Sequence, residues 1–184
     1  MTTAETDRLI IRHPVEGDRD RFVELFTDET FTVFSGGVHD VESANARFDR
    51  MLAVASAVPY AKQPVIERAT GAIVGYTGVD TLLFEGVERM EWGWRFVPEA
   101  RGKGYATEAT SALLAIADRH HDGEMLCLIA VDNHPSRRVA DKVGFDWWRR
   151  VVWPDGVATD LLLRSIGAGG APLVAPASIS RGQL

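Results

Sequence analysis

The chain has 184 residues, of which 46% are hydrophobic and 25% are charged, a composition typical of one folded domain. Its net charge of −6 disfavours a nucleic-acid partner and mildly favours a cationic one, and no apolar run is long enough to cross a membrane. The single cysteine excludes an internal disulfide, and the N-terminus lacks the basic start and apolar stretch of a signal peptide. We therefore expect a cytoplasmic protein.

The first third of the chain alternates a strand with two helices. Residues 9–11 are apolar and predict a strand, and residues 18–26 have apolar side chains at helical spacing. Residues 27–40 are loop-like, with the breaker Ser35-Gly36-Gly37, and Asp40 is placed to cap a second helix that ends at Ala57 before Pro59.

The central and C-terminal parts predict a meander followed by a strand–helix pattern. Strands are expected at residues 64–68, 73–79, 89–97, 126–131, 145–152 and 157–163, and helices at 105–120 and 135–143. Turns are expected at Thr70-Gly71 and Glu85-Gly86. From residue 167 to 184 glycine, alanine, proline and serine dominate, so we expect a domain over 1–166 and a disordered tail.

One loop carries the clearest chemical signal. Residues 101–106, Arg-Gly-Lys-Gly-Tyr-Ala, join an expected strand to an expected helix. Glycines let the backbone turn tightly and expose successive N–H groups, and the helix start adds a partial positive charge. Such a junction can bind a pyrophosphate, with Arg101 and Lys103 as neighbouring cations. The other interpretation is an ordinary exposed loop with two turn glycines.

Four segments, in order, resemble the GNAT superfamily of N-acetyltransferases, and within it the branch that acetylates ribosomal-protein N-termini. The pattern Arg-x-x-Gly-x-Ala at 101–106 resembles the acetyl-CoA loop of that superfamily. The other matches are Glu5 to Arg12, Glu91-Trp92-Gly93-Trp94 with Pro98-Glu99, and Asn133-His134-Pro135-Ser136 with Lys142-Val143-Gly144-Phe145. The resemblance extends from about Glu5 to Arg164.

The resemblance implies a fold, a cosubstrate and a reaction. The fold would be α/β, with a mixed, mostly antiparallel sheet, parallel fourth and fifth strands, and helices on both faces. Acetyl-CoA would be the cosubstrate, without a metal, and a primary amine would attack it directly in a ternary complex. The branch favours the N-terminal α-amine of a protein or peptide as the acceptor. An α-amine also loses its proton more readily than a lysine side chain, because its pKa is near 8 and that of lysine is about 10.4.

The cofactor-binding residues that the resemblance implies lie on two strand ends and the loop. They are Phe96, Val97, Arg101, Gly102, Lys103, Gly104, Tyr105, Ala106, Asn133 and Ser136. A backbone N–H near Phe96 and Val97 would bind the thioester oxygen. Of Asn133 and Ser136, we expect one to cap the short helix and the other to contact the cofactor.

The catalytic groups are less determined. Glu91 is the candidate base, and it could equally be a carboxylate that only orients the acceptor; Asp80 and Glu88 are acids that could replace it. Many family members carry a tyrosine acid where Ala140 stands in this chain. Ser136 or solvent would then protonate the leaving thiolate.

Other interpretations stay open. The acceptor could be a small-molecule amine, such as an antibiotic, a polyamine or an amino-acid derivative, or the chain could be a non-catalytic acyl-CoA-binding module. The chain could also form a homodimer. The histidines have no metal-ligand spacing, and Cys127 lies in an apolar run that predicts a buried strand thiol.

Overall fold

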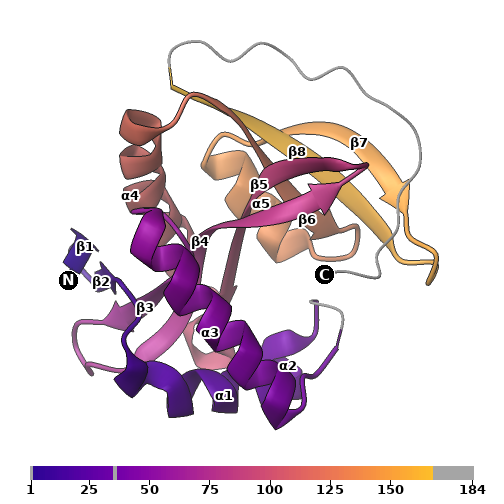
Figure 1. Ribbon diagram of the computed structural model, residues 1–184. Helices are drawn as coiled ribbons and strands as arrows, with labels where there is room; N and C mark the ends of the chain where they lie inside the picture. Colours follow the sequence, from indigo (N-terminus) through magenta and orange to yellow (C-terminus); the bar gives the residue numbers. More distant parts are fainter. Residues whose placement is uncertain (1, 35–36, 168–184) are drawn as a thin grey trace. The chain divides into compact units, whose positions relative to one another are not determined.

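Figure 1 shows the computed structural model, which describes residues 2–34 and 37–167. Its strands are β1 Thr2–Glu5, β2 Leu9–Arg12, β3 Gln63–Glu67, β4 Ile73–Phe84, β5 Val87–Phe96, β6 Gly123–Ala130, β7 Asp146–Val152 and β8 Ala158–Ile166. Its α-helices are α1 Arg19–Thr27, α2 Glu29–Thr32, α3 Val41–Ala57, α4 Tyr105–His120 and α5 His134–Lys142. The breaker residues Ser35-Gly36 and the expected tail after Gly167 lie outside the described residues, so disorder of that tail stays a prediction.

The strands form a mixed sheet. They are hydrogen-bonded in the order β1-β2-β3-β4-β5-β6-β8-β7. The pairs β1–β2, β2–β3, β3–β4, β6–β8 and β7–β8 are antiparallel, whereas β5 and β6 are parallel, with Met90 opposite Met125 and Glu91 opposite Leu126. The expected mixed sheet with a parallel pair formed by the strands at 89–97 and 126–131 is therefore confirmed.

The sequence pattern missed two short elements. Strand β1, Thr-Thr-Ala-Glu, is mostly polar and pairs with β2 at the edge of the sheet, so it has no apolar alternation to detect. Helix α2 lies within the expected loop at 27–40, where the Asp28 side chain caps it by accepting a hydrogen bond from the backbone N–H of Phe31 at 2.8 Å. The expected cap of α3 is confirmed, since Asp40 accepts from the N–H of Ser43.

The described residues divide into two compact units, one formed by those within 2–78 and 94–116 and the other by those within 79–93 and 117–167. Strands β4 and β5 contribute residues to both units. The expectation of one acetyltransferase domain over 1–166 stays a prediction.

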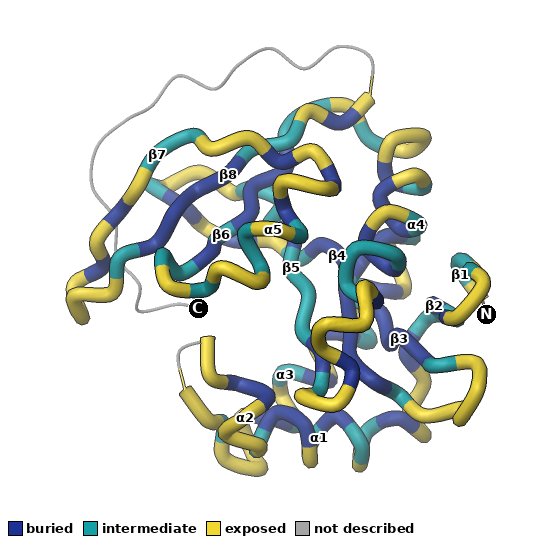
Figure 2. The backbone as a smooth tube through the Cα atoms, turned by 180° about the vertical axis from the view of Figure 1, so that it is seen from behind, coloured by how far each residue is buried: buried dark blue, intermediate teal, exposed yellow. Residues whose placement is uncertain are grey.

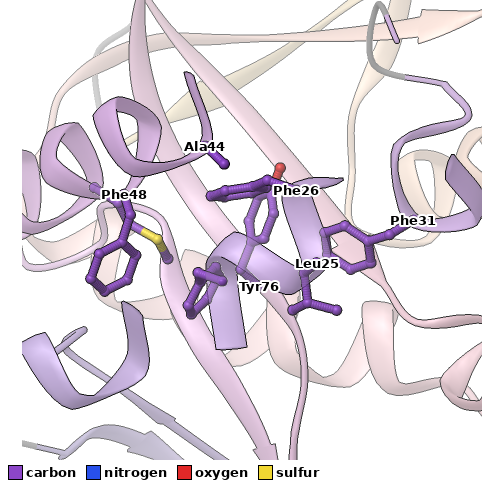
Figure 3. Packing of buried hydrophobic residues seen from close by; sticks show 8 residues of the cluster. Leu25, Phe26, Phe31, Ala44, Phe48 and Tyr76 are labelled. Atoms are coloured by element: carbon purple, nitrogen blue, oxygen red, sulfur yellow. The ribbon is translucent and has the colours of Figure 1, made fainter. Parts of the chain in front are cut away.

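In the first unit, helices cover both faces of β4. Neighbouring side chains of a strand point to opposite faces, so Tyr76 and Thr77 contact different helices. The Tyr76 ring packs with Phe22 and Phe26 of α1 and with Phe31 of α2, in a buried cluster (Figure 3). The next residue, Thr77, is fully buried and its hydroxyl lies 2.9 Å from the hydroxyl of Thr110 on α4. Helix α1 also packs against α3.

The second unit is built around β8, which lies between β6 and β7 and is mostly buried (Figure 2). Its apolar cluster joins β4, β6, β7 and β8 with the loop after β7, and its buried members are Leu82, Phe84, Leu126, Val151, Trp153 and Leu161. Strand β7 forms the edge of the sheet, and its register with β8 shifts between Trp147 and Arg149. Cys127 is a buried free thiol, as expected.

The turn between β4 and β5 contains a buried ion pair. Glu85 and Gly86 both have positive φ, 52° and 74°, which is the backbone of a type I′ hairpin turn. The Glu85 side chain is only 2% exposed, and its carboxylate lies 2.6 Å from the guanidinium of Arg149 on β7. Glu85 is thus a non-glycine residue in the left-handed region, where a side chain is ordinarily disfavoured.

Gly75 provides a test of how closely β4 approaches β5. A Cβ atom at Gly75 would lie 2.2 Å from the carbonyl oxygen of Arg95, whereas one at Gly17 would meet nothing within 4 Å. We expect Gly75→Ala to lower the free energy of unfolding by about 2 kcal/mol or more, because backbone atoms must move apart. Urea unfolding of this variant and of the control Gly17→Ala measures the effect, and equal losses would contradict the close approach.

Candidate active site

The loop between β5 and α4 has the backbone geometry that a pyrophosphate site requires. The chain leaves β5, makes a short 3-10 helix at Pro98–Ala100, turns through the exposed residues 101–104 and enters α4. Gly102 and Gly104 have φ of 74° and 83°, in the left-handed region that favours glycine. The first hydrogen bond of the helix runs from Glu108 N–H to Gly104 carbonyl, so the N–H groups before Glu108 are those that a helix start offers to a ligand.

Arg101 connects this loop to the fold, and its place beside the phosphates stays a prediction. Its Nε donates to the Phe96 carbonyl at 3.0 Å, and its Nη2 donates to the Thr30 carbonyl at 2.6 Å. The guanidinium therefore connects the end of β5 and helix α2 to the loop. These bonds position the loop backbone, and Arg101 and Lys103 are both exposed cations of the turn.

A second arginine, which the sequence reasoning did not single out, anchors the other end of the loop. Arg8 donates from Nε and Nη2 to Glu108 Oε2, at 2.8 and 2.5 Å, and from Nη1 to the Lys103 carbonyl at 2.9 Å. Thr6 adds a hydrogen bond of 2.6 Å to Glu108 Oε1. Burial alone raises the pKa of Glu108, but the bonds from Thr6 and Arg8 outweigh it and the net pKa is lowered. The only sequence signal was that Thr6 and Arg8 lie in the first strand match.

Tyr105 contributes its backbone to the loop, because its side chain is engaged elsewhere. The hydroxyl donates to Glu67 Oε1 at 2.7 Å, and this bond raises the pKa of Tyr105 and lowers that of Glu67. The Arg8 guanidinium lies 4.7 Å and the Lys103 ammonium 5.8 Å from the centre of its ring. The ring thus supports two cations at the start of α4.

At the end of β5, the backbone N–H groups of Phe96 and Val97 point in different directions. Both were expected to be candidate donors to the thioester oxygen. Val97 N–H already donates to the Val74 carbonyl at 3.0 Å. Successive N–H groups of a strand point to opposite sides, so the Phe96 N–H points away from β4. The Val97 expectation is corrected accordingly, and Phe96 remains the candidate donor.

Three of the expected site residues lie in the second unit. Asn133 and Ser136 lie at the start of α5, and Glu91 lies on β5. Asn133 accepts a hydrogen bond from the Ser136 N–H at 3.2 Å and caps α5, which settles which of the two is the cap. The contact of Ser136 with the cofactor stays a prediction. Glu91 is half-buried on β5, next to the fully buried Trp92, whose side chain points to the opposite face.

The structure thus brings together Phe96, Val97 and residues 101–106 within the first unit, and Asn133 with Ser136 within the second. Over residues 2–34 and 37–167, no group of three histidine, cysteine or acidic side chains could hold a metal ion. None of the helices in these ranges is both long and apolar enough to span a membrane.

The Glu108 carboxylate gives a pH-dependent test of the loop anchor. Because its folded pKa is lowered, its stabilisation is complete above the unfolded pKa of about 4.3 and is lost as pH falls through the folded value. We expect Glu108→Gln to unfold about 1 kcal/mol more easily at pH 7, with the difference shrinking towards pH 3. Denaturant unfolding at several pH values measures it. The control Glu24→Gln removes an exposed pair with Arg21 and should change little; a loss for Glu108→Gln that stays constant with pH would contradict the anchor.

Comparisons with known proteins agree with this arrangement. The family model described as an acetyltransferase (GNAT) domain matches residues 8–146. The uncharacterized protein YkkB of Bacillus subtilis (strain 168) is 29% identical over 160 residues, which cover 82% of this chain and 88% of YkkB. A putative GnaT-family acetyltransferase from Bordetella pertussis has a TM-score of 0.76 at 26% identity, covering 88% of this chain and 98% of its own.

A third protein shares the fold at low identity. RimL, a ribosomal L7/L12 α-N-protein acetyltransferase solved in complex with coenzyme A, has a TM-score of 0.70 at 14% identity, over 90% of this chain and 98% of its own. The matched family model spans most of the chain and includes β5, the loop, α4 and the whole of α5. The chain is therefore an acyltransferase that belongs to the GNAT acetyltransferase family.

Proposed function

We propose that this protein transfers the acetyl group of acetyl-CoA to a primary amine, by direct attack in a ternary complex. The observation that carries the proposal is the exposed turn at residues 101–104, with both glycines in the left-handed region and the start of α4 directly behind it. This backbone suits an anionic pyrophosphate. The coenzyme A complex of RimL, a protein of the same fold, supports the same cofactor class.

Within the first unit, the loop and β5 would divide the cofactor between them. The N–H groups of Gly102, Gly104 and the first turn of α4, up to Ala106, would bind the pyrophosphate, with the exposed Lys103 as a nearby cation. The Phe96 N–H would bind the thioester oxygen, where negative charge grows as the amine attacks. Arg101 would act indirectly, by fixing the loop through its bonds to Phe96 and Thr30.

The chemical step needs a neutral amine and a proton for the departing thiolate. The amine nitrogen forms a bond to the thioester carbon, the carbon–sulfur bond breaks, and the sulfur leaves as the thiolate of coenzyme A. Glu91, directly or through water, would accept the proton that the amine gives up. The Ser136 hydroxyl or solvent would protonate the thiolate. Asn133, as the cap of α5, would position Ser136.

For the acceptor, we propose an α-amine. An α-amine of pKa near 8 is about one-tenth neutral at pH 7, whereas a lysine of pKa about 10.4 is neutral about once in 2,500 molecules. A site with one candidate base suits the easier nucleophile. The resemblance to the ribosomal-protein branch favours a protein or peptide N-terminus, and a small-molecule amine is the alternative. A non-catalytic acyl-CoA-binding module would bind the cofactor without releasing thiol in the presence of amines.

Replacing Gly104 tests the cofactor loop. We expect Gly104→Val to weaken acetyl-CoA binding by about tenfold or more, because a β-branched side chain is disfavoured at positive φ and would hinder approach to the backbone. The matched control is Gly156→Val, which introduces the same strain at φ 82° in the turn between β7 and β8, where a Cβ atom would meet nothing within 4 Å. Calorimetric titration measures both, and unchanged affinity in a folded Gly104→Val protein would remove the loop from the cofactor site.

Replacing Glu91 tests the base. We expect Glu91→Gln to lower turnover by about 10²-fold, with a smaller loss at high pH, where the amine arrives deprotonated. Glu88→Gln, on the same strand, is the matched control and should retain turnover. A thiol-release assay across pH measures both variants. A loss in Glu91→Gln that does not change with pH would assign Glu91 an orienting role, and a large loss in Glu88→Gln alone would move the base to that residue.

A further inference from the structure

The first unit contains a cluster of arginines stacked on buried aromatic rings. We call it the arginine–aromatic cluster, and it consists of Arg47, Arg95, Phe26, Phe31 and Tyr76. The Arg95 guanidinium on β5 lies 5.6 Å from the centre of the Phe31 ring and 5.7 Å from that of Tyr76, and the Arg47 guanidinium on α3 lies 5.3 Å from that of Phe26. Figure 3 shows the three rings gathered between the helices and β4. Both arginines are half-buried, whereas Tyr76 is 3% exposed.

Positively charged side chains surround the phenol of Tyr76 and shift its pKa. Burial alone raises the pKa of the Tyr76 phenol, but the charges of Arg95, Arg47 and Lys62 and a hydrogen bond with Arg47 lower it, and the net shift is downward. A buried phenol with a lowered pKa requires a strong excess of positive charge around it.

The same two arginines also act on His39, which lies beside the cluster. Burial lowers its pKa, the charges of Arg47 and Arg95 lower it further, and Asp40 is the acid that opposes them. The His39 ring lies 6.2 Å from that of Phe26. Two titratable groups at different points of the cluster therefore both favour the form with less positive charge.

The cluster adjoins the end of β5 that the proposed function uses. Arg95 directly precedes Phe96, whose N–H is the candidate donor to the thioester oxygen, and both residues belong to the first unit. The Arg95 side chain contacts Tyr76 and Phe31 on the face of the sheet covered by α1 and α2. A group bound by Arg95 would therefore lie one residue along the strand from Phe96, which carries the candidate N–H donor.

Stacking on aromatic rings explains part of this arrangement but not its charge. Each arginine–ring contact contributes about 0.5–1 kcal/mol. Gathering Arg47, Arg95 and Lys62 around one buried phenol opposes that gain, because like charges repel more strongly where water is excluded. An anionic ligand would reverse the sign of this interaction and use the half-buried guanidinium groups as donors.

We propose that the acceptor amine is carried by a molecule that also bears an anionic group, a carboxylate or a phosphate, which the arginine–aromatic cluster binds. This inference rests on the proposed acetyltransferase function and specifies its substrate class. It disfavours polyamines and other polycationic amines as acceptors, because they would be repelled at the cluster. The net charge of −6 argues the other way, but a bound group responds mainly to the charges close to it, since solvent ions screen the distant ones.

Matched amines that differ in charge test the proposal. The carboxylate arm compares phenylalanine with phenylalaninamide, the phosphate arm compares phosphoethanolamine with ethanolamine, and spermidine represents polycations. Thiol release from acetyl-CoA gives kcat/KM for the wild type, Arg47→Gln and Arg95→Gln, and for the control Arg21→Gln, which alters an arginine paired with Glu24 on α1. For each acceptor, the kcat/KM of the wild type is divided by that of the variant. This ratio is independent of the amine pKa, because the same amine is used in both measurements.

We expect wild type to prefer the anionic member of at least one pair by about tenfold or more, and Arg47→Gln and Arg95→Gln to lose about tenfold of that preference. The arm that shows the preference identifies carboxylate or phosphate, and Arg21→Gln should behave as wild type. Preference for neutral amines or spermidine, or preferences unchanged in both folded cluster variants, would overturn the anionic acceptor and leave the acetyltransferase function standing. Binding of acetyl-CoA without thiol release from any amine would instead reject the proposed function itself.

Discussion

The turn from β5 into α4 depends on charge-assisted hydrogen bonds that hold it from both sides. Arg101 connects the turn to β5 and α2, and the Glu108 carboxylate, in the first turn of α4, receives donors from Thr6 and Arg8 beside β2. A turn with two left-handed glycines is intrinsically free to adopt many conformations, because glycine restricts the unfolded chain least. These contacts give the exposed backbone one geometry, so that its N–H groups are ordered before a ligand arrives.

Most of the architecture was predictable from apolar periodicity and turn residues. Helix α4 begins and ends where the pattern predicted, and Asp40 and Asn133 cap helices as their types suggest. Strand β1 could not be predicted, because its polar side chains follow no alternation and its order comes from pairing with β2. Helix α2 is a single turn whose signal, an aspartate cap, is too short to separate from a loop.

The candidate site was predictable in its backbone and less so in its side chains. The glycine spacing indicated the loop, but no pattern in the sequence could direct the Arg101 side chain to the Phe96 and Thr30 carbonyls, since that depends on where α2 packs. Likewise, only strand pairing distinguishes the Val97 N–H, used by Val74, from that of Phe96. The arginine–aromatic cluster was not visible because Arg47 and Arg95 are far apart in the chain and meet only through folding.

Strand β7 at the edge of the sheet has a consequence for self-association. An unpaired strand edge can template the addition of another chain, and natural proteins often prevent this with bulges and cationic side chains. The shift of register between Trp147 and Arg149 gives β7 the first feature, and the exposed Arg150 is a cationic side chain paired with Asp160 on β8. The same strand exposes the large apolar side chains of Trp147 and Val152, so the shifted register is the feature of β7 that opposes regular addition of another strand.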